Sequence, residues 1–260
     1  MNHQPRKRFG QNFLVDESAI HAIVSAIAPR SDEHLVEIGP GLGALTRQLL
    51  PECAKLDVIE LDRDLVAALT IKYADEDKLR IHSGDALKFD FSALADGASL
   101  RVIGNLPYNI STPLLFHLFA QSDCIQDMHF MLQKEVVDRL CAEPGDKDYG
   151  RLGVMASYYC HMEALFDVHP ESFHPSPKVT SSVVRLVPHS EKPVAIAHEA
   201  LGRVVAAAFS QRRKTLRNSL GTLFSASEIV SLGIAPGERA EKLSLAEFAR
   251  LAEWLVQNEK

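Results

Sequence analysis

A glycine-rich turn between an apolar segment and a helix-forming segment is the feature that most constrains the fold of this chain. Residues 34–38 form a short apolar run, residues 39–43 read Gly-Pro-Gly-Leu-Gly, and residues 44–50 have a helix-forming composition. Glycines at such a turn let the backbone approach a ligand closely, and the N–H groups of the following helix point toward that ligand. The pattern therefore predicts a strand, a tight turn and a helix, with a nucleotide-like ligand at the turn.

Strand-forming and helix-forming segments alternate through the first half of the chain. An amphipathic helix capped by Asp16 or Ser18 comes first and ends near residue 28. The expected strands are residues 34–38, 56–60, 79–83, 100–104 and 128–132, and the expected helices between them are residues 44–50, 62–73 and 112–120. Such alternation is typical of a parallel sheet with helices on both faces. We therefore predict an α/β class with a doubly wound, Rossmann-like sheet.

The pattern changes after Cys160. Residues 164–168 and 179–187 are rich in strand-forming residues and are joined by a proline-containing segment, so they predict a hairpin at the sheet edge. Residues 187–193 are polar and turn-rich, which is typical of a linker, and everything from residue 195 onward is helix-forming. We predict two domains: residues 1–188, which bind the ligand, and residues 195–260, a small all-helical domain.

Basic residues gather in two segments, although the formal net charge of the 260 residues is −6. Neither segment contains an acidic residue, so each can form a local positive patch. The residues are Arg6, Lys7 and Arg8 near the N-terminus, and Arg203, Arg212, Arg213, Lys214 and Arg217 in the helical domain. Such patches can bind nucleic acid, but each can equally be a solvated face or tail. Charge alone therefore leaves RNA binding open.

Several classes of protein are disfavoured. No apolar run approaches the roughly 20 residues that span a bilayer, and the basic N-terminus lacks the apolar core of a signal peptide. The four cysteines are far apart and the histidines are scattered, so neither a disulfide framework nor a metal site is expected. We therefore expect a cytoplasmic protein with no metal and no membrane partner.

Acidic residues follow the second and third expected strands. Glu60 lies about 20 residues after the turn, where an acidic residue can accept hydrogen bonds from ribose hydroxyls. Asp85 can accept a hydrogen bond from an adenine amine, or it can cap the turn that follows it. The spacing Gly39-x-Gly41-x-x-Ala44 also satisfies a nicotinamide-dinucleotide fingerprint. At this point a dehydrogenase and a methyltransferase remain equally open.

The tetrapeptide Asn105-Leu106-Pro107-Tyr108 follows the fourth expected strand and favours methyl transfer to an amine. An adenine amino nitrogen is a poor nucleophile because its lone pair is delocalised into the ring. Asn105 can accept one amine hydrogen through its side-chain oxygen, and a backbone carbonyl near Leu106 can accept another. Pro107 fixes the turn, and Tyr108 offers a ring on which a flipped adenine can stack. The competing interpretation is an ordinary strand-ending turn with a capping asparagine.

These residues resemble a known family, the small-subunit ribosomal RNA adenine dimethyltransferases of the KsgA/RsmA type, over nearly the whole chain. Residues 8–14, Arg-Phe-Gly-Gln-Asn-Phe-Leu, are similar to the N-terminal signature of the family and imply cofactor contacts for Asn12 and Leu14. The other positions that match cofactor-binding residues of the family are Gly39, Glu60, Asp85 and Asn105, and Gly41 belongs to the same turn. The resemblance implies S-adenosyl-L-methionine as the cofactor.

Two further motifs carry the resemblance. Residues 173–179, Phe-His-Pro-Ser-Pro-Lys-Val, resemble an element whose aromatic ring helps to sandwich the target base, which implies that Phe173 lies opposite Tyr108. Without the resemblance, Phe173 would be interpreted as core packing. Residues 209–220 resemble the C-terminal signature of a small helical domain that helps to engage the ribosomal subunit. Basic residues there would contact phosphates, so target choice must come from RNA shape and the pocket.

The resemblance implies N6,N6-dimethylation of two adjacent adenines in the 3′-terminal hairpin loop of small-subunit (16S) ribosomal RNA, with a role in subunit biogenesis. The expected partners are the small ribosomal subunit and its RNA, and nothing in the sequence demands more than a monomer. The nearest competing function is that of a large-subunit ribosomal RNA adenine methyltransferase of the antibiotic-resistance type. Less favoured are a DNA adenine methylase, which usually has proline where Leu106 stands, and a nicotinamide dehydrogenase. A main role as a ribosome-assembly factor that binds the immature subunit is compatible with catalysis and stays open.

Overall fold

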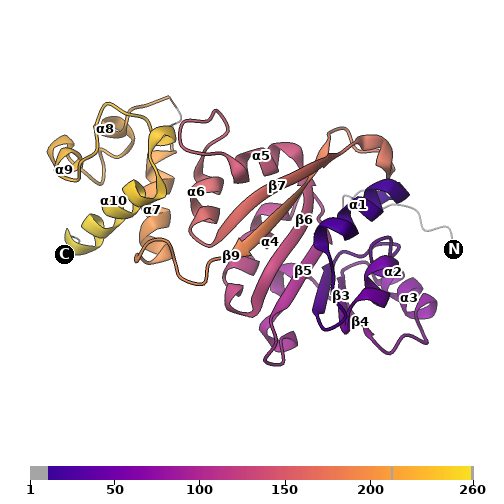
Figure 1. Ribbon diagram of the computed structural model, residues 1–260. Coiled ribbons are helices and arrows are strands. Elements are labelled where there is room, and N and C mark those ends of the chain that lie inside the picture. Colours follow the sequence, from indigo (N-terminus) through magenta and orange to yellow (C-terminus); the bar gives the residue numbers. More distant parts are fainter. Residues whose placement is uncertain (1–10, 212, 259–260) are drawn as a thin grey trace. The chain divides into compact units, whose positions relative to one another are not determined.

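The computed structural model describes residues 11–211 and 213–258, and the chain divides into two compact units (Figure 1). The sheet unit comprises Met1–Val137 and Glu163–Pro188, and the helical unit comprises Asp138–Met162 and His189–Lys260. Residues 138–162 therefore group with the C-terminal helices, whereas the sequence pattern places them in the first domain. The reason is hydrogen bonding: Tyr149 Oη donates to the Leu243 carbonyl at 2.8 Å, and the Gly145 N–H donates to the Glu241 carbonyl at 2.7 Å.

The sheet has seven strands in the order β4-β3-β2-β5-β6-β9-β7. The strands are β2 (His34–Ile38), β3 (Lys55–Glu60), β4 (Leu79–Ser83), β5 (Leu100–Asn105), β6 (Ile125–Gln133), β7 (Cys160–Val168) and β9 (Ser181–Pro188). The pairs β2–β3, β3–β4, β2–β5 and β5–β6 are parallel, and β9 runs antiparallel to β6. This order confirms the predicted doubly wound sheet, with β7 and β9 at one edge. A separate two-stranded sheet pairs β1 (Phe13–Leu14) with β8 (Phe173–His174).

The first helix of the sheet unit begins at the cap that the sequence predicts. In α1 (Glu17–Ile27), the Asp16 carboxylate accepts hydrogen bonds from the N–H groups of Ser18 and Ala19, as predicted for a cap. One face of α1 is buried through three isoleucines, Ile20, Ile23 and Ile27. The remaining helices of the sheet unit are α2 (Thr46–Leu49), α3 (Arg63–Lys72) and α4 (Ser111–Phe119), while α5 (Lys134–Cys141) crosses into the helical unit.

The helical unit is built from short helices around a leucine-rich and phenylalanine-rich interior. Its helices are α6 (Arg151–Ser157), α7 (His198–Ala208), α8 (Leu216–Ser219), α9 (Ala226–Ser231) and α10 (Leu245–Asn258). Helix α7 packs on α6, α8 and α10. Phe248 of α10 is fully buried and lies 5.8 Å from the ring of Phe209. The helical C-terminal portion predicted from the sequence is therefore present.

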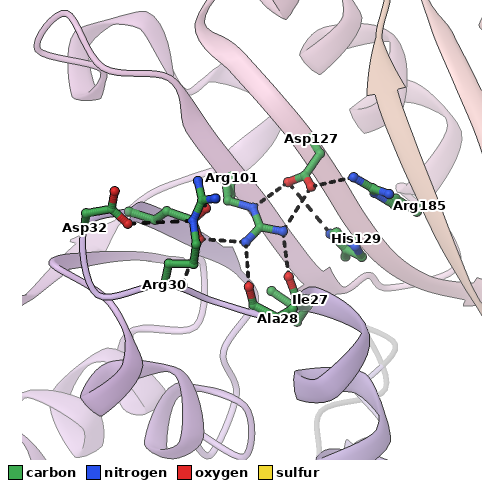
Figure 2. A network of polar contacts seen from close by, with 9 residues as sticks. Ile27, Ala28, Arg30, Asp32, Arg101, Asp127, His129 and Arg185 are labelled. Atoms are coloured by element: carbon green, nitrogen blue, oxygen red, sulfur yellow. Dashed lines mark hydrogen bonds and ion pairs between the residues drawn. The ribbon is translucent and has the colours of Figure 1, made fainter.

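Buried charges join α1 to the amino ends of β5 and β6, as Figure 2 shows. The Arg101 guanidinium donates to both carboxylate oxygens of Asp127, at 2.8 and 3.0 Å, and to Glu33 at 2.7 Å. The same guanidinium donates to the carbonyls of Ile27 at 2.6 Å and Ala28 at 3.3 Å. Arg101 thus satisfies carbonyl groups that the last turn of α1 leaves without helical partners.

A second buried network surrounds Asp57 in the first half of β3. Ring nitrogens of His34 and His82 each lie 2.5 Å from a different carboxylate oxygen of Asp57, and Lys55 Nζ lies 3.3 Å away. Burial by itself would raise the pKa of Asp57, but the two histidine hydrogen bonds and the Lys55 charge outweigh it and hold that pKa well below its usual range. Asp57 is therefore a charged group whose partners are supplied by the fold.

Candidate active site

A cavity of about 330 Å³ lies at the carboxyl ends of the parallel strands in the sheet unit. Open α/β sheets bind their ligands at this edge. Ten of the residues predicted from the sequence for cofactor binding or catalysis line it, and they come from the N-terminal segment and from the ends of four strands. They are Asn12, Leu14, Gly39, Gly41, Glu60, Asp85, Asn105, Leu106, Pro107 and Tyr108. The fold thus brings together residues up to 96 positions apart in the chain, from Asn12 to Tyr108.

The glycine turn needs glycine for both conformation and space. Gly39, Gly41 and Gly43 have φ angles of +67°, +58° and +78°, in the left-handed region that side chains disfavour. A Cβ atom at Gly41 would lie 3.0 Å from the Phe13 ring, and one at Gly43 would lie 3.0 Å from Tyr73 Oη. The turn therefore packs closely against Phe13 and Tyr73, while Gly39 and Gly41 line the cavity.

Glu60 braces the glycine turn from the end of β3. Its carboxylate accepts hydrogen bonds from the Gly41 N–H at 3.2 Å and from the Asp62 N–H at 2.9 Å. Asp62 in turn caps α3 and accepts a hydrogen bond from Gln11 Nε2 at 3.2 Å. Burial raises the pKa of Glu60 and outweighs the backbone hydrogen bonds that lower it. A buried carboxylate of this kind would gain from further hydrogen-bond donors on a ligand.

Glu37 is a second buried carboxylate in the cavity wall, and the sequence motifs did not reveal it. It lies on β2, and one of its oxygens accepts a hydrogen bond from Thr46 Oγ1 at 2.6 Å. Burial, reinforced by the nearby charge of Glu60, raises the pKa of Glu37 to about 7. The signal in the sequence is a lone acidic residue inside an otherwise apolar strand. Such a group favours a positively charged ligand, which would stabilise its ionised form.

Asp85 and Asn105 each hold part of the cavity wall in place. The Asp85 carboxylate accepts a hydrogen bond from the Leu87 N–H at 3.0 Å, so it caps a short turn while it also lines the cavity. Asn105 donates from Nδ2 to the Asn12 carbonyl at 3.1 Å, which fastens the N-terminal segment to the end of β5. Both interpretations of Asp85, as cap and as cavity residue, are therefore compatible with one geometry.

The segment after β5 is fixed by backbone hydrogen bonds. The Leu106 N–H donates to the Met131 carbonyl at 3.2 Å, and the Ile110 N–H donates to the Pro107 carbonyl at 3.1 Å. Ser111 Oγ donates to the Tyr108 carbonyl at 3.2 Å. The turn thus uses the carbonyls of Pro107 and Tyr108, whereas no donor among the described residues reaches that of Leu106. This is the carbonyl position that the tetrapeptide motif suggests as an amine acceptor.

Phe173 is the predicted base-contacting residue that the structure does not place among those lining the cavity. Its side chain is 4% exposed and belongs to the same core cluster as Leu14, its partner in the β1–β8 pair. Next to it, Ser172 Oγ donates to the Asp16 carboxylate at 3.0 Å. In this structure Phe173 supports the N-terminal segment through core packing, and its contact with a base stays a prediction.

Three basic residues of the C-terminal signature lie on the surface of the helical unit. Arg213, Lys214 and Arg217 are exposed, while Leu216 beside them is fully buried and anchors α8. Four other residues predicted to bind RNA, Arg6, Lys7, Arg8 and Arg212, lie outside the described residues. The three described side chains are thus presented to solvent on an anchored backbone, which suits contact with phosphates.

Metal-binding clusters and membrane-spanning helices are both missing from residues 11–211 and 213–258. No group of three or more His, Cys, Asp or Glu side chains in these ranges is arranged to hold a metal ion. In the same ranges, no helix combines the length and apolar character needed to cross a membrane.

Comparison with known proteins gives both a family match and close relatives. The model of the family described as ribosomal RNA adenine dimethylase matches residues 2–257. Over 255 residues the chain is 62% identical to ribosomal RNA small subunit methyltransferase A of Methylococcus capsulatus, covering 98% of this chain and 99% of the relative. It is 57% identical over 255 residues to the protein of the same name from Thiobacillus denitrificans, with the same coverage of 98% and 99%.

Two solved structures share the architecture. A dimethyladenosine transferase from Plasmodium falciparum superposes with a TM-score of 0.83 at 25% identity and covers 94% of this chain and 98% of its own. The 23S rRNA methyltransferase ErmE superposes with a TM-score of 0.74 at 24% identity and covers 95% of this chain and 100% of its own. These likenesses confirm a Rossmann-like methyltransferase fold with a helical C-terminal portion.

Proposed function

The chain belongs to the ribosomal RNA adenine dimethylase family, and on that premise we propose that it transfers methyl groups from S-adenosyl-L-methionine to N6 of two adjacent adenines in the 3′-terminal hairpin loop of small-subunit ribosomal RNA. The observation that carries the choice of subunit is the 62% identity, over nearly the full length of both chains, to a small-subunit methyltransferase. A large-subunit target is not favoured, because ErmE is only 24% identical and shares the fold alone.

The cavity fits a nucleoside ligand that carries positive charge. The glycine turn gives it a backbone surface, and the two buried carboxylates of Glu37 and Glu60 would be stabilised as anions by a cation. When bound, S-adenosyl-L-methionine supplies an electrophilic methyl group on a sulfonium centre. We assign its binding to Asn12, Leu14, Gly39, Gly41, Glu60, Asp85 and Asn105, which all line the cavity.

The segment after β5 is assigned to the target adenine. Because Asn105 donates from Nδ2 to Asn12, its Oδ1 is the atom that can accept a hydrogen from the adenine amine. The Leu106 carbonyl can accept the second hydrogen, so the nitrogen lone pair is directed rather than spread into the ring. Pro107 holds the turn and Tyr108 offers the stacking surface. The methylated amine can release its proton to solvent, so no residue has to act as a strong base.

The second stacking partner implied by the family resemblance is Phe173. Its side chain is buried in the core cluster that contains Leu14, so it would have to be uncovered before it could contact a base. We retain the assignment as part of the proposal. A Phe173→Leu variant would keep an apolar side chain in the core but would remove the aromatic surface from the base.

The remaining assignments concern the partner. We assign Arg213, Lys214 and Arg217, which are exposed, to contacts with ribosomal RNA phosphates. Arg6, Lys7, Arg8 and Arg212 are assigned the same role from the sequence alone. The enzyme would act as a monomer in the cytoplasm on the small ribosomal subunit, with a role in its biogenesis and with no metal ion.

The direct test is methyl transfer from labelled S-adenosyl-L-methionine to small ribosomal subunits taken from cells that lack this class of enzyme. Primer-extension stops at two adjacent adenines near the 3′ end of the RNA are expected, and they should be strongly reduced when Asn105→Ala reacts for the time that wild type needs for completion. Label confined to large-subunit RNA or to DNA would overturn the assigned substrate. Failure of S-adenosyl-L-methionine to bind in calorimetry would overturn the assigned cofactor.

A further inference from the structure

We infer that Ser181 is a positioning residue that fixes the ring of Tyr108 for the target base, an inference that rests on the proposed function. Tyr108 Oη and Ser181 Oγ lie 2.9 Å apart, within hydrogen-bond distance, although 73 positions separate the two residues in the chain. Tyr108 lines the cavity after β5, and Ser181 begins the antiparallel strand β9. The contact therefore ties the stacking surface to a different element of the sheet.

Ser181 is held in place on both sides. Its side chain is 0% exposed, and its backbone is in register with Gln133 at the end of β6. Next to it, the Lys134 N–H donates to the Thr180 carbonyl at 3.0 Å. Because the backbone around Ser181 is paired and its side chain is enclosed, the hydroxyl has little freedom to move. The Ser181 hydroxyl can therefore restrain the side chain of Tyr108 through their hydrogen bond.

Tyr108 needs such a restraint. It is only half-buried, and one side of it borders the cavity, where packing cannot restrain the ring. Its main chain is fixed by Ser111 Oγ, which leaves rotation about the side-chain bonds as the remaining freedom. A hydrogen bond at the far end of the ring removes that freedom before the base arrives. A preorganised surface aligns the amine without a further cost in side-chain entropy.

The neighbouring residue provides a matched control. Ser182 is also buried, at 2% exposed, and its Oγ donates to the Phe166 carbonyl at 3.2 Å. Successive side chains of a strand point to opposite faces, so Ser182 faces away from Ser181. Replacing either serine with alanine removes one buried hydroxyl from the same strand. Only the replacement at Ser181 removes a contact with the proposed stacking residue.

The experiment compares wild type, Ser181→Ala, Tyr108→Phe, the double variant and Ser182→Ala in methyl transfer to undermethylated small subunits. Loss of one hydrogen bond should lower kcat by about three- to tenfold in Ser181→Ala and in Tyr108→Phe. The double variant should be no slower than either single variant, because both remove the same bond. The KM for S-adenosyl-L-methionine should not change, since the ring is assigned to the base.

Ser182→Ala should keep the kcat of wild type even where it lowers the urea midpoint as much as Ser181→Ala does. Losses that multiply in the double variant, or an equal loss of kcat in Ser182→Ala, would overturn the positioning role while leaving the proposed function intact. Absence of transfer by wild type would overturn the proposed function, and the positioning role with it.

Discussion

At the amino ends of β5 and β6, the Arg101 guanidinium has carboxylate oxygens of both Asp127 and Glu33 within 3.0 Å. At the carboxyl ends of β2 and β3, the buried carboxylates of Glu37 and Glu60 instead face a cavity, and their hydrogen-bond donors are a hydroxyl and backbone N–H groups. The two edges belong to one sheet. At the amino ends of β5 and β6 the charges are paired within the fold. At the carboxyl ends of β2 and β3 a ligand could pair them.

The pKa values of Asp57 on β3 and Glu37 on the adjacent strand β2 differ in the same way. Burial alone would raise both, but the partners of Asp57 hold its pKa well below the usual range, whereas the pKa of Glu37 rises to about 7. A carboxylate whose partners outweigh its burial contributes stability. Glu37 costs stability as an anion, because the Thr46 hydroxyl and the charge of Lys72 do not outweigh its burial. The balance between partners and burial therefore distinguishes Asp57 from Glu37, which lines the cavity.

The largest expected effect comes from removing Arg101, which pairs the buried carboxylates at the amino ends of β5 and β6. Arg101→Met should lower the free energy of unfolding by about 3–5 kcal/mol, because Asp127 and Glu33 would be left as buried charges without their main partner. Urea unfolding measures the loss. The control is Arg30→Met, since Arg30 also pairs with Glu33, at 3.0 Å, but is 66% exposed and should matter by less than about 1 kcal/mol. Equal losses in the two variants would contradict this account of the amino edge.

A substitution of Asn105 in the cavity wall should affect catalysis more than folding. Asn105→Ala should lower the single-turnover rate of methyl transfer by about a hundredfold, because an oriented acceptor at the reacting nitrogen is lost. Cofactor affinity in calorimetry should fall only by the value of one contact. The free energy of unfolding should fall by about 1 kcal/mol at most, because the hydrogen bond to the Asn12 carbonyl is lost. A near-normal rate would remove Asn105 from the mechanism.

Glu37 in the cavity wall should make the wild-type protein lose stability as pH rises. The pKa of Glu37 is about 7 in the folded state and about 4.3 in the unfolded state. Between these pH values the folded protein binds a proton that the unfolded protein does not, so stability falls as pH rises through this range. Glu37→Gln lacks this group, so between pH 5 and pH 8 its free energy of unfolding should rise relative to that of wild type by about 2–3 kcal/mol. Parallel stability curves for the two proteins would show that Glu37 is not perturbed.

Asp57, whose partners outweigh its burial, should show the opposite sign of pH dependence. Its folded pKa lies below its unfolded value of about 3.9, so its contribution is present above that pH and is lost as pH falls through the folded pKa. Asp57→Asn should be less stable than wild type by about 1 kcal/mol at pH 7, and the gap should narrow below about pH 4. Urea midpoints at a series of pH values measure it, and a gap that widens in acid would contradict the assignment.

Much of the fold was predictable because it depends on local patterns. The cap at Asp16, the glycine turn and the alternation of strands and helices are each contained in a few consecutive residues, and the structure has all of them. Residues 138–162 were less tractable, because hydrogen bonds to residues about a hundred positions later draw them to the helical unit. A pattern within the segment carries no record of those partners.

The sequence by itself determined the family, the fold class and ten residues that line the cavity, because the motifs around them are short and lie in the N-terminal segment or at the ends of strands. Only the tertiary structure decided that Asn105 holds Asn12, that Tyr108 meets Ser181 and that Phe173 is buried beside Leu14. These pairs are 93, 73 and 159 positions apart. Their contacts depend on strand order and packing, which bring distant residues together only when the whole sheet has formed.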